Sequence, residues 1–176
     1  MSSVAYEFPW QFSFPPFFTL QTHEETRRKQ LDAWCQLITS YCKHQNIFIL
    51  TYPDCQEQLP FCNKSLNRRL SVDAVIVVLE ELKRRNQLIW LENSNTKKNC
   101  LVLWRSIDEW ARMLSDSIRQ RGSLNTVCTL YELTDGHDAH TEFKNIPQSL
   151  LLEIIHQLEK QGKAALVGKE GVKFSL

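Results

Sequence analysis

The sequence predicts an α+β fold, mostly α, in which two copies of one small domain follow an N-terminal segment rich in proline and aromatic residues. The first observation behind this prediction is a repeat of apolar residues at an offset of 76 positions, which begins at Trp34 and Trp110. The second is a change of apolar spacing within each copy, from the three- and four-residue steps of a helix to the alternation of a strand. The 176 residues, 43% of them hydrophobic and 23% charged, suffice for two small domains with cores of their own.

The repeat extends over two separate stretches of sequence. WCQLITSYCKHQN, which starts at Trp34, resembles WARMLSDSIRQRG, which starts at Trp110. The same offset relates a second stretch without a gap. Its matched pairs are Leu70 with Ile146, Val75 with Leu151, Val78 with Ile154, Leu79 with Ile155, Leu82 with Leu158, and Asn86 with Gly162. Because the intervening loops look unrelated, this match indicates two copies of one domain.

The first copy begins with an amphipathic helix that should end near Asn46. Its apolar stripe, at steps of three and four residues, is formed by Leu31, Cys35, Ile38 and Cys42. The stretch IFILTY (47–52) is expected to be extended. A polar loop then leads to NKSLNRRL (63–70), which we interpret as a short second helix.

A third helix follows in each copy. In the first copy, Ser71 and Asp73 suit its first positions, and Asn86 suits the left-handed conformation in which a helix ends. Its apolar face is formed by Val75, Val78, Leu79 and Leu82. In the second copy, TVCTLYEL (126–133) and a loop correspond to the extended stretch and the second helix. Ile146-Pro147 then opens the third helix, with the proline in its first turn.

Two extended stretches after each third helix predict a β-hairpin. In the first copy these are LIWL (88–91) and CLVLW (100–104), joined by the polar turn ENSNTKKN. In the second copy they are AALV (164–167) and VKFS (172–175), joined by GKEG. Helix, strand, helix, helix and hairpin is the order of a winged-helix domain. We therefore expect an extended anchor segment at 1–22 and tandem winged helices at 23–104 and 105–176.

The charge pattern argues against DNA binding, which is the function that a winged helix alone would suggest. The net charge is +1, and no run of like charge exceeds the three residues of Lys83-Arg84-Arg85. Acidic side chains lie in the middle of both third helices, where a groove-reading helix would meet phosphates. The polar positions are Asp73, Glu80, Glu81, Lys83, Arg84 and Arg85 in one helix and Gln148, Glu153, His156, Gln157, Glu159 and Lys160 in the other. We interpret the basic run as complementing the helix macrodipole.

The sequence offers little catalytic chemistry. Six scattered cysteines are interpreted as reduced thiols, and Cys35 and Cys42 lie on the apolar stripe of the first helix. DGHDAH (135–140) resembles a metal site in composition, but a flexible polar loop has the same composition. We therefore expect no enzyme activity, no metal and no cofactor. No apolar run approaches the ~18 residues of a membrane helix, so a cytoplasmic protein that reaches membranes through partners is expected.

The segment FPWQFSFPPFF (8–18) contains six aromatic residues and three prolines. It has none of the features of a signal peptide. Its rings either fold back onto their own domain or bind a groove of another protein. Some of them, such as Phe8 or Trp10, are expected to pack on the first domain, whereas Pro15-Pro16-Phe17-Phe18 is expected to contact a partner.

The chain resembles the small subunit of the ESCRT-II endosomal sorting complex, the vacuolar-protein-sorting-25 family. The motifs that carry the resemblance are PWQFSFPPFFTLQ, LEELKRRNQLIWL, a tryptophan followed by DEWA at 104–111, and TLYEL with GVKF near the C-terminus. The resemblance implies two tandem winged helices and no enzyme activity. It also implies an assembly in which two copies of this subunit join two larger winged-helix subunits, on endosomal membranes where ubiquitinated cargo enters multivesicular bodies.

The resemblance further implies two protein-binding sites. A Pro-Pro-x-Phe motif, here Pro15, Pro16 and Phe18, docks on the larger subunits, and the second winged helix binds the N-terminal helix of an ESCRT-III subunit. The predicted contacts with the larger subunits are Phe8, Trp10, Phe12, Phe14, Pro15, Pro16, Phe17 and Phe18. The predicted contacts with the ESCRT-III subunit are Lys163, Lys169, Val172, Lys173 and Phe174.

Two alternatives remain open from the residues themselves. Val172 and Phe174 point to the same side of a strand, so both belong either to the ESCRT-III contact or to the domain's own core, with Lys173 exposed. The alternative function is that of a winged-helix transcription factor, which would bind duplex DNA with a steep dependence on salt.

Overall fold

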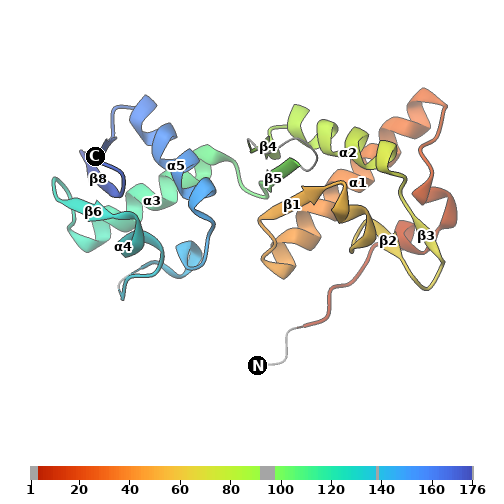
Figure 1. Cartoon of the computed structure of the whole chain (residues 1–176), viewed down its shortest axis with the longest axis horizontal. Coiled ribbons are helices and arrows are strands. Elements are labelled where there is room, and N and C mark those ends of the chain that lie inside the picture. The colour runs from red at the N-terminus through yellow and green to blue at the C-terminus, as the bar shows by residue number, and fades with distance from the viewer. Residues whose placement is uncertain (1–3, 92–97, 138, 176) are drawn as a thin grey trace. The chain divides into compact units, whose positions relative to one another are not determined.

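The computed structural model describes residues 4–91, 98–137 and 139–175 (Figure 1). The chain divides into two compact units, Met1–Trp104 and Arg105–Leu176. Each unit combines helices with a three-stranded antiparallel sheet. We describe each unit by itself.

The N-terminal segment of the first unit forms two short 3-10 helices, η1 (Trp10–Ser13) and η2 (Pro15–Phe18). The amide of Phe12 donates to the carbonyl of Pro9 at 3.0 Å, and the amide of Phe17 donates to that of Phe14 at 3.0 Å. The prediction of an extended segment is therefore wrong over these residues. The prolines fix φ near the value that a helical turn also uses, so they are compatible with tight turns as well as with extended chain.

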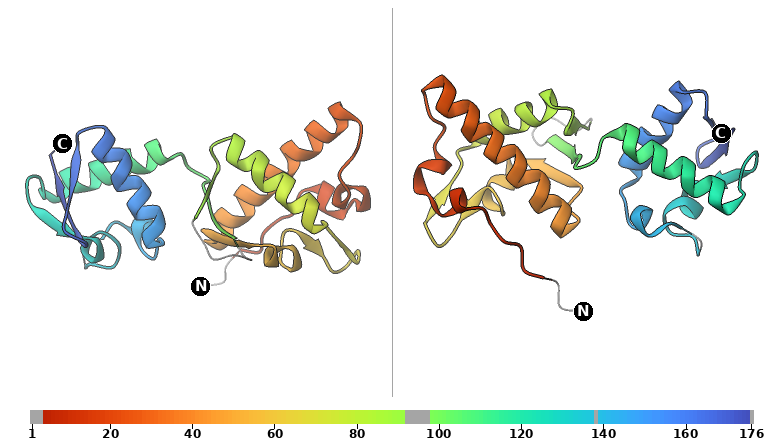
Figure 2. Two further views of the ribbon diagram at one scale, coloured as in Figure 1. Left: turned by 45° about the horizontal axis from the view of Figure 1, so that its top comes forward. Right: turned by 180° about the vertical axis from the view of Figure 1, so that it is seen from behind.

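Two α-helices form the centre of the first unit, α1 (Glu24–Gln45) and α2 (Val72–Arg84). They pack against each other, as Figure 2 shows from two directions. Helix α1 ends at Asn46 in the left-handed conformation, with φ 54°. Helix α2 begins after Ser71, whose hydroxyl accepts a hydrogen bond from the amide of Ala74 at 3.1 Å. Both of these helix ends were predicted from the sequence.

The sheet of the first unit has the strand order β1-β5-β4. It consists of β1 (Ile49–Tyr52), β4 (Leu88–Trp90) and β5 (Lys98–Val102), and Leu88 pairs with Val102 in the hairpin. The predicted hairpin is thus present, although residues 92–97 of its polar turn lie outside the described residues. Leu50, Cys100 and Val102 join the side chains of both helices in one buried core.

The prediction of a short helix at residues 63–70 is wrong. Strands β2 (Cys62–Asn63) and β3 (Arg68–Arg69) form a small antiparallel hairpin there, and the nearest helical turn is η3 (Asp54–Glu57). Inside the hairpin, the side chain of Asn63 accepts from the amide of Leu66 at 3.2 Å, and Asn67 adopts φ 50°. Asparagine favours such turns over helix interiors because its side chain bonds to nearby backbone groups.

The second unit begins with α3 (Ile107–Arg121), which has a capping box between Ser106 and Glu109 and ends at Gly122 with φ 68°. The remaining elements are β6 (Val127–Thr129), α4 (Leu130–Thr134), η4 (Thr141–Phe143), α5 (Gln148–Lys160), β7 (Ala164–Val167) and β8 (Gly171–Phe174). Its sheet has the order β6-β8-β7. Pro147 is the N-cap of α5 rather than part of its first turn.

The repeated positions occupy equivalent places in the two units. Trp34 and Trp110 are at most 2% exposed. Both members of every matched apolar pair from Leu70/Ile146 to Leu82/Leu158 are buried. Asn86 and Gly162 share the left-handed conformation, with φ 57° and 71°. The offset of 76 residues therefore relates buried positions of one unit to buried positions of the other, and the end of one helix to the end of its counterpart.

Candidate functional site

The aromatic residues of the N-terminal segment fall into a buried set and an exposed set. Phe12, Phe17 and Phe18 are at most 7% exposed and belong to the core of the first unit. Trp10 is 71% exposed and Phe14 is 48% exposed. Pro15 and Pro16 are also exposed, whereas Phe8 is half-buried.

The buried rings stack on the helices and on one another. Phe17 lies parallel to Trp34 with ring centroids 4.3 Å apart, and Phe18 meets the edge of the same indole at 5.6 Å. Phe8 stacks on Phe12 at 4.0 Å. The prediction that Phe8 packs on its own domain is therefore confirmed, and the same prediction for Trp10 is wrong.

This burial limits which residues of the motif reach a partner. Phe12, Phe17 and Phe18 are buried in their own unit, so their rings offer at most a few per cent of their surface to another protein in this conformation. Sequence reasoning did not separate the two sets, because the rings alternate along 3-10 turns whose phase the sequence pattern does not reveal.

The exposed set forms one wall of an apolar groove. Trp10 and Phe14 lie with their ring centroids 5.8 Å apart. The groove has a volume of about 360 Å³ and is lined by Trp10, Gln11, Phe14, Pro16, Phe17, Gln21, Thr26, Lys29, Gln30 and Ala33. Among the described residues, the side-chain oxygen Oε1 of Gln11 is buried without a hydrogen-bond partner.

The second predicted surface also separates into buried and exposed residues. Val172 and Phe174 are 0% exposed and belong to the core of the second unit. Their prediction as partner contacts is wrong for this conformation, because strand β8 turns these two side chains inward. The three lysines of the predicted surface are exposed, namely Lys163, Lys169 and Lys173. For Lys173 this agrees with the alternative in which Val172 and Phe174 belong to the core of the domain.

The outer face of this sheet carries apolar residues on its two edge strands, on both sides of Lys173. Lys173 pairs with Val127 on one side and Ala165 on the other, and Gly171 pairs with Val167. Val127 is 54% exposed and Val167 is 46% exposed. We call Val127, Ala165, Val167, Gly171 and Lys173 the outer sheet face. The alternation in β6, with Cys128 buried between Val127 and Thr129, is the signal that identifies Val127 as outward.

Gly171 brings the two exposed valines close together. A Cβ atom at this position would lie 2.8 Å from the carbonyl oxygen of Val167 and 3.0 Å from Cγ1 of Val127. Only a residue without a side chain fits there without a shift of its neighbours. The glycine therefore lets the exposed valines of the two edge strands approach each other across β8.

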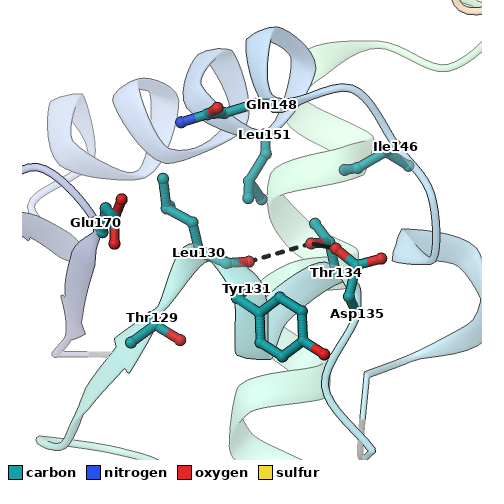
Figure 3. Close-up of a pocket in the computed structure, with 9 residues that line it drawn as sticks. All are labelled: Thr129, Leu130, Tyr131, Thr134, Asp135, Ile146, Gln148, Leu151 and Glu170. Atoms are coloured by element: carbon teal, nitrogen blue, oxygen red, sulfur yellow. Dashed lines mark hydrogen bonds between the residues drawn. The ribbon is translucent and has the colours of Figure 1, made fainter.

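A hollow of about 380 Å³ lies beside α4, between β6 and the start of α5 (Figure 3). Its lining combines the apolar Leu130, Ile146 and Leu151 with the carboxylates of Asp135 and Glu170. The hydroxyl of Thr134, which also faces the hollow, donates to the carbonyl of Leu130 at 3.2 Å and to Asp135 at 2.7 Å. These hydrogen bonds stabilise the short helix and leave this hydroxyl engaged.

Two of the three cations in the basic run at the end of α2, Arg84 and Arg85, form ion pairs. Glu81 accepts from Arg84 at 2.6 and 2.8 Å and from Arg85 at 2.8 Å, and Arg85 also pairs with Asp32. The hydrogen bonds from Arg84 and then Arg85 lower the pKa of Glu81 to about 2. These contacts support a structural role over phosphate binding, so they count against a transcription factor.

Buried thiols and the DGHDAH loop complete the list of candidate chemistry. Burial raises the pKa of the Cys42 thiol to about 12 and that of Cys35 to about 11, so both stay protonated at neutral pH. The side chain of His140 accepts a hydrogen bond from the amide of Glu142 and caps η4. Within residues 4–91, 98–137 and 139–175, no three His, Cys, Asp or Glu side chains are placed to hold a metal ion.

The chain is similar to known proteins along nearly its whole length. A model of the family described as ESCRT-II complex subunit matches residues 11–147. The chain is 42% identical to vacuolar protein-sorting-associated protein 25 of Danio rerio, over 97% of this chain and 99% of the relative. It is 39% identical to the protein of the same name from Homo sapiens, over 98% of this chain and 99% of the relative.

Solved structures show the same similarity. The crystal structure of subunit VPS25 of the endosomal trafficking complex ESCRT-II matches with a TM-score of 0.84 and 27% identity, over 95% of this chain and 98% of that chain. A chain in the crystal structure of endosomal complex ESCRT-II, composed of VPS22, VPS25 and VPS36, matches with a TM-score of 0.82, 28% identity and the same coverage. No helix in the described part of the chain combines the length and apolar character that a membrane crossing requires.

Proposed function

The chain belongs to the family of ESCRT-II complex subunits, and on that premise we propose that it is the small, non-enzymatic subunit of an ESCRT-II complex. Its partners in that complex are two larger subunits that correspond to VPS22 and VPS36 of the solved assembly. It is a cytoplasmic protein that functions in vacuolar protein sorting, and it reaches the endosomal membrane through the complex. In this proposal, each half of the chain is a winged-helix domain and two copies join each complex.

The observation that carries the proposal is the pair of large exposed rings, Trp10 and Phe14, beside an apolar groove. Large exposed apolar side chains that are clustered rather than scattered mark protein-binding surfaces. Pro15 and Pro16, the first two residues of η2, follow Phe14 directly and are exposed as well. These four residues form the docking surface for the larger subunits, and the buried rings of the segment fix it to the first unit.

The outer sheet face of the second unit is the docking surface that we propose for the ESCRT-III subunit. Its apolar residues, Val127, Ala165 and Val167, lie on the edge strands β6 and β7 and match the apolar stripe of an amphipathic helix. Lys173 lies between them on the central strand β8, and Lys163 and Lys169 are exposed at the two ends of β7. Acidic residues beside the apolar stripe of the partner helix complement these cations. Binding there recruits the ESCRT-III subunit in the sorting of ubiquitinated cargo into multivesicular bodies.

The first experiment tests the docking surface. The purified chain is mixed with the two larger subunits, and the mass of the complex is measured by light scattering after gel filtration. The double variant Phe14→Ala/Pro16→Ala is expected to elute separately from the larger subunits. Leu59→Ala, which removes another exposed apolar side chain of the same unit, is the matched control and is expected to assemble. Normal assembly of the double variant contradicts the docking proposal.

The second experiment tests the outer sheet face. Lys173→Glu is expected to weaken binding of the N-terminal helix of the ESCRT-III subunit, measured by titration calorimetry, while assembly with the larger subunits stays intact. Lys144→Glu, which changes the charge by the same amount at an exposed loop position, is the control. If the two variants bind with equal affinity, the contact lies on another face of the second unit. The next candidate is then α5 near Glu153 and Gln157.

A further inference from the structure

Three polar side chains of the first unit are buried against the N-terminal segment. Gln30 on α1 and Asn63 on β2 are each 8% exposed, and Trp34 on α1 is 0% exposed. Buried polar groups of this kind are normally satisfied by hydrogen bonds, and each of these three bonds to the backbone of the segment.

Gln30 makes the largest share of these contacts. Its Nε2 donates to the carbonyl of Phe17 at 3.0 Å and to that of Thr19 at 2.9 Å. Its Oε1 accepts from the amide of Gln21 at 3.0 Å. One side chain thus binds three backbone groups on the C-terminal side of the two exposed prolines.

Trp34 and Asn63 extend this contact toward the N-terminus. Nε1 of Trp34 donates to the same Phe17 carbonyl at 3.0 Å, so this oxygen accepts two bonds from α1. Nδ2 of Asn63 donates to the carbonyl of Phe12 at 2.8 Å. The turn that carries Phe14 and the two prolines is therefore held on both sides.

The composition of the segment explains why side chains take this role. A proline has no backbone N–H, so a stretch with three prolines cannot form a regular strand ladder with a neighbour. Its carbonyl groups still need donors once they are buried. Side chains on α1 and β2 supply them.

We infer that Gln30, Trp34 and Asn63 are positioning residues, which hold the backbone of the segment in the shape that presents Trp10, Phe14, Pro15 and Pro16 to the larger subunits. The inference rests on the proposed docking function. Because the surface is formed before binding, the entropy of ordering it is lost on folding rather than on association. Loss of these bonds therefore lowers affinity although none of the three side chains belongs to the docking surface.

The test uses Gln30→Met, which keeps the length of the side chain and removes its hydrogen bonds. Gln36→Met, at an exposed position of the same helix, is the matched control, and Asn63→Leu is the second variant. Amide hydrogen exchange of the free chain is measured by mass spectrometry. Exchange in residues 10–21 is expected to become at least tenfold faster in both test variants, while that of α2 stays as in the unmodified chain.

Association with the two larger subunits is then measured by biolayer interferometry. Gln30→Met is expected to lower the affinity about tenfold, mainly through a slower association rate, and Gln36→Met is expected to leave it unchanged. Trp10→Ala is included to test the docking surface directly. If Trp10→Ala binds normally, the docking proposal fails, while the exchange data still decide whether these residues hold the segment.

Three outcomes overturn the inference. The first is unchanged exchange in residues 10–21 of both test variants. The second is faster exchange throughout the first unit, including α2, which would give Gln30 a general role in stability. The third is a combination of results in which Gln30→Met speeds exchange only in residues 10–21 and leaves the association kinetics unchanged, while Trp10→Ala weakens binding.

Discussion

Because the N-terminal rings divide into an exposed and a buried set, Trp10→Ala should mainly weaken binding to the larger subunits, and Phe17→Ala should mainly lower stability. Trp10 is 71% exposed, which corresponds to roughly 180 Å² of a side chain that buries up to about 250 Å². At about 25 cal/mol per Å², full burial of that area against a partner is worth at most about 4.5 kcal/mol. Because aromatic hot spots typically contribute about 2–4 kcal/mol, Trp10→Ala should raise the Kd for the larger subunits by roughly 30- to 1000-fold.

In stability the order is reversed, because Phe17→Ala should lower the free energy of unfolding much more than Trp10→Ala. Trp10→Ala should change the free energy of unfolding by less than about 0.5 kcal/mol, because the side chain is exposed. Phe17 is 4% exposed and stacks on Trp34, so Phe17→Ala should cost about 3–5 kcal/mol.

The assay combines urea unfolding, followed by tryptophan fluorescence, with titration calorimetry against the larger subunits at a temperature where both variants are folded. The reasoning is refuted if Phe17→Ala keeps the stability of the unmodified chain and loses binding, while Trp10→Ala binds normally. That result would mean that the segment leaves the first unit when it binds.

Three further predictions concern stability. Leu79→Ala and Ile155→Ala, at equivalent fully buried positions of the two units, should each cost about 2–5 kcal/mol in their own unit, measured by chemical unfolding. A melting curve like that of the unmodified chain for either variant would show that the equivalence is wrong. The hydrogen bond from Arg84 lowers the pKa of Glu81 from 4.5 to about 2, so the carboxylate stabilises the fold above pH 4.5, and this contribution is lost as the pH falls toward 2. Glu81→Gln should flatten the pH dependence of unfolding in that window, and an unchanged slope would exclude this origin. Gln11→Met removes an unsatisfied buried oxygen, so it should raise stability by about 1 kcal/mol, measured by chemical unfolding. Lower stability would show that the oxygen has a partner in the folded chain.

Much of the fold was predictable because its signals are local and occur twice. The stripe of α1, the Ser71 cap and the left-handed ends at Asn86 and Gly162 each depend on a few neighbouring residues. The hairpin at residues 62–69 was missed because its turn depends on a hydrogen bond from the amide of Leu66 to the side chain of Asn63, which no apolar period reveals.

The candidate sites were predictable as segments but not residue by residue. The density of rings identified the N-terminal segment, yet the burial of Phe17 depends on its contact with Trp34, which follows later in the chain. On β8 the alternation did separate Lys173 from its buried neighbours. Val127 was missed because it lies on a different strand, and only the pairing of β6 with β8 brings it beside Lys173.

The burial of Phe12, Phe17 and Phe18 in the first unit has a consequence for biosynthesis. These rings are synthesised before every other part of their core, whereas β5, which completes the sheet, ends at Val102. At about 5–20 residues per second, a ribosome needs roughly 5–15 s to reach that strand. During this interval the rings lack most of their final neighbours, so a nascent chain presents an aromatic, aggregation-prone stretch to chaperones. Deleting the segment would shorten that exposure but would also remove part of the core, so a truncated chain should accumulate poorly in cells.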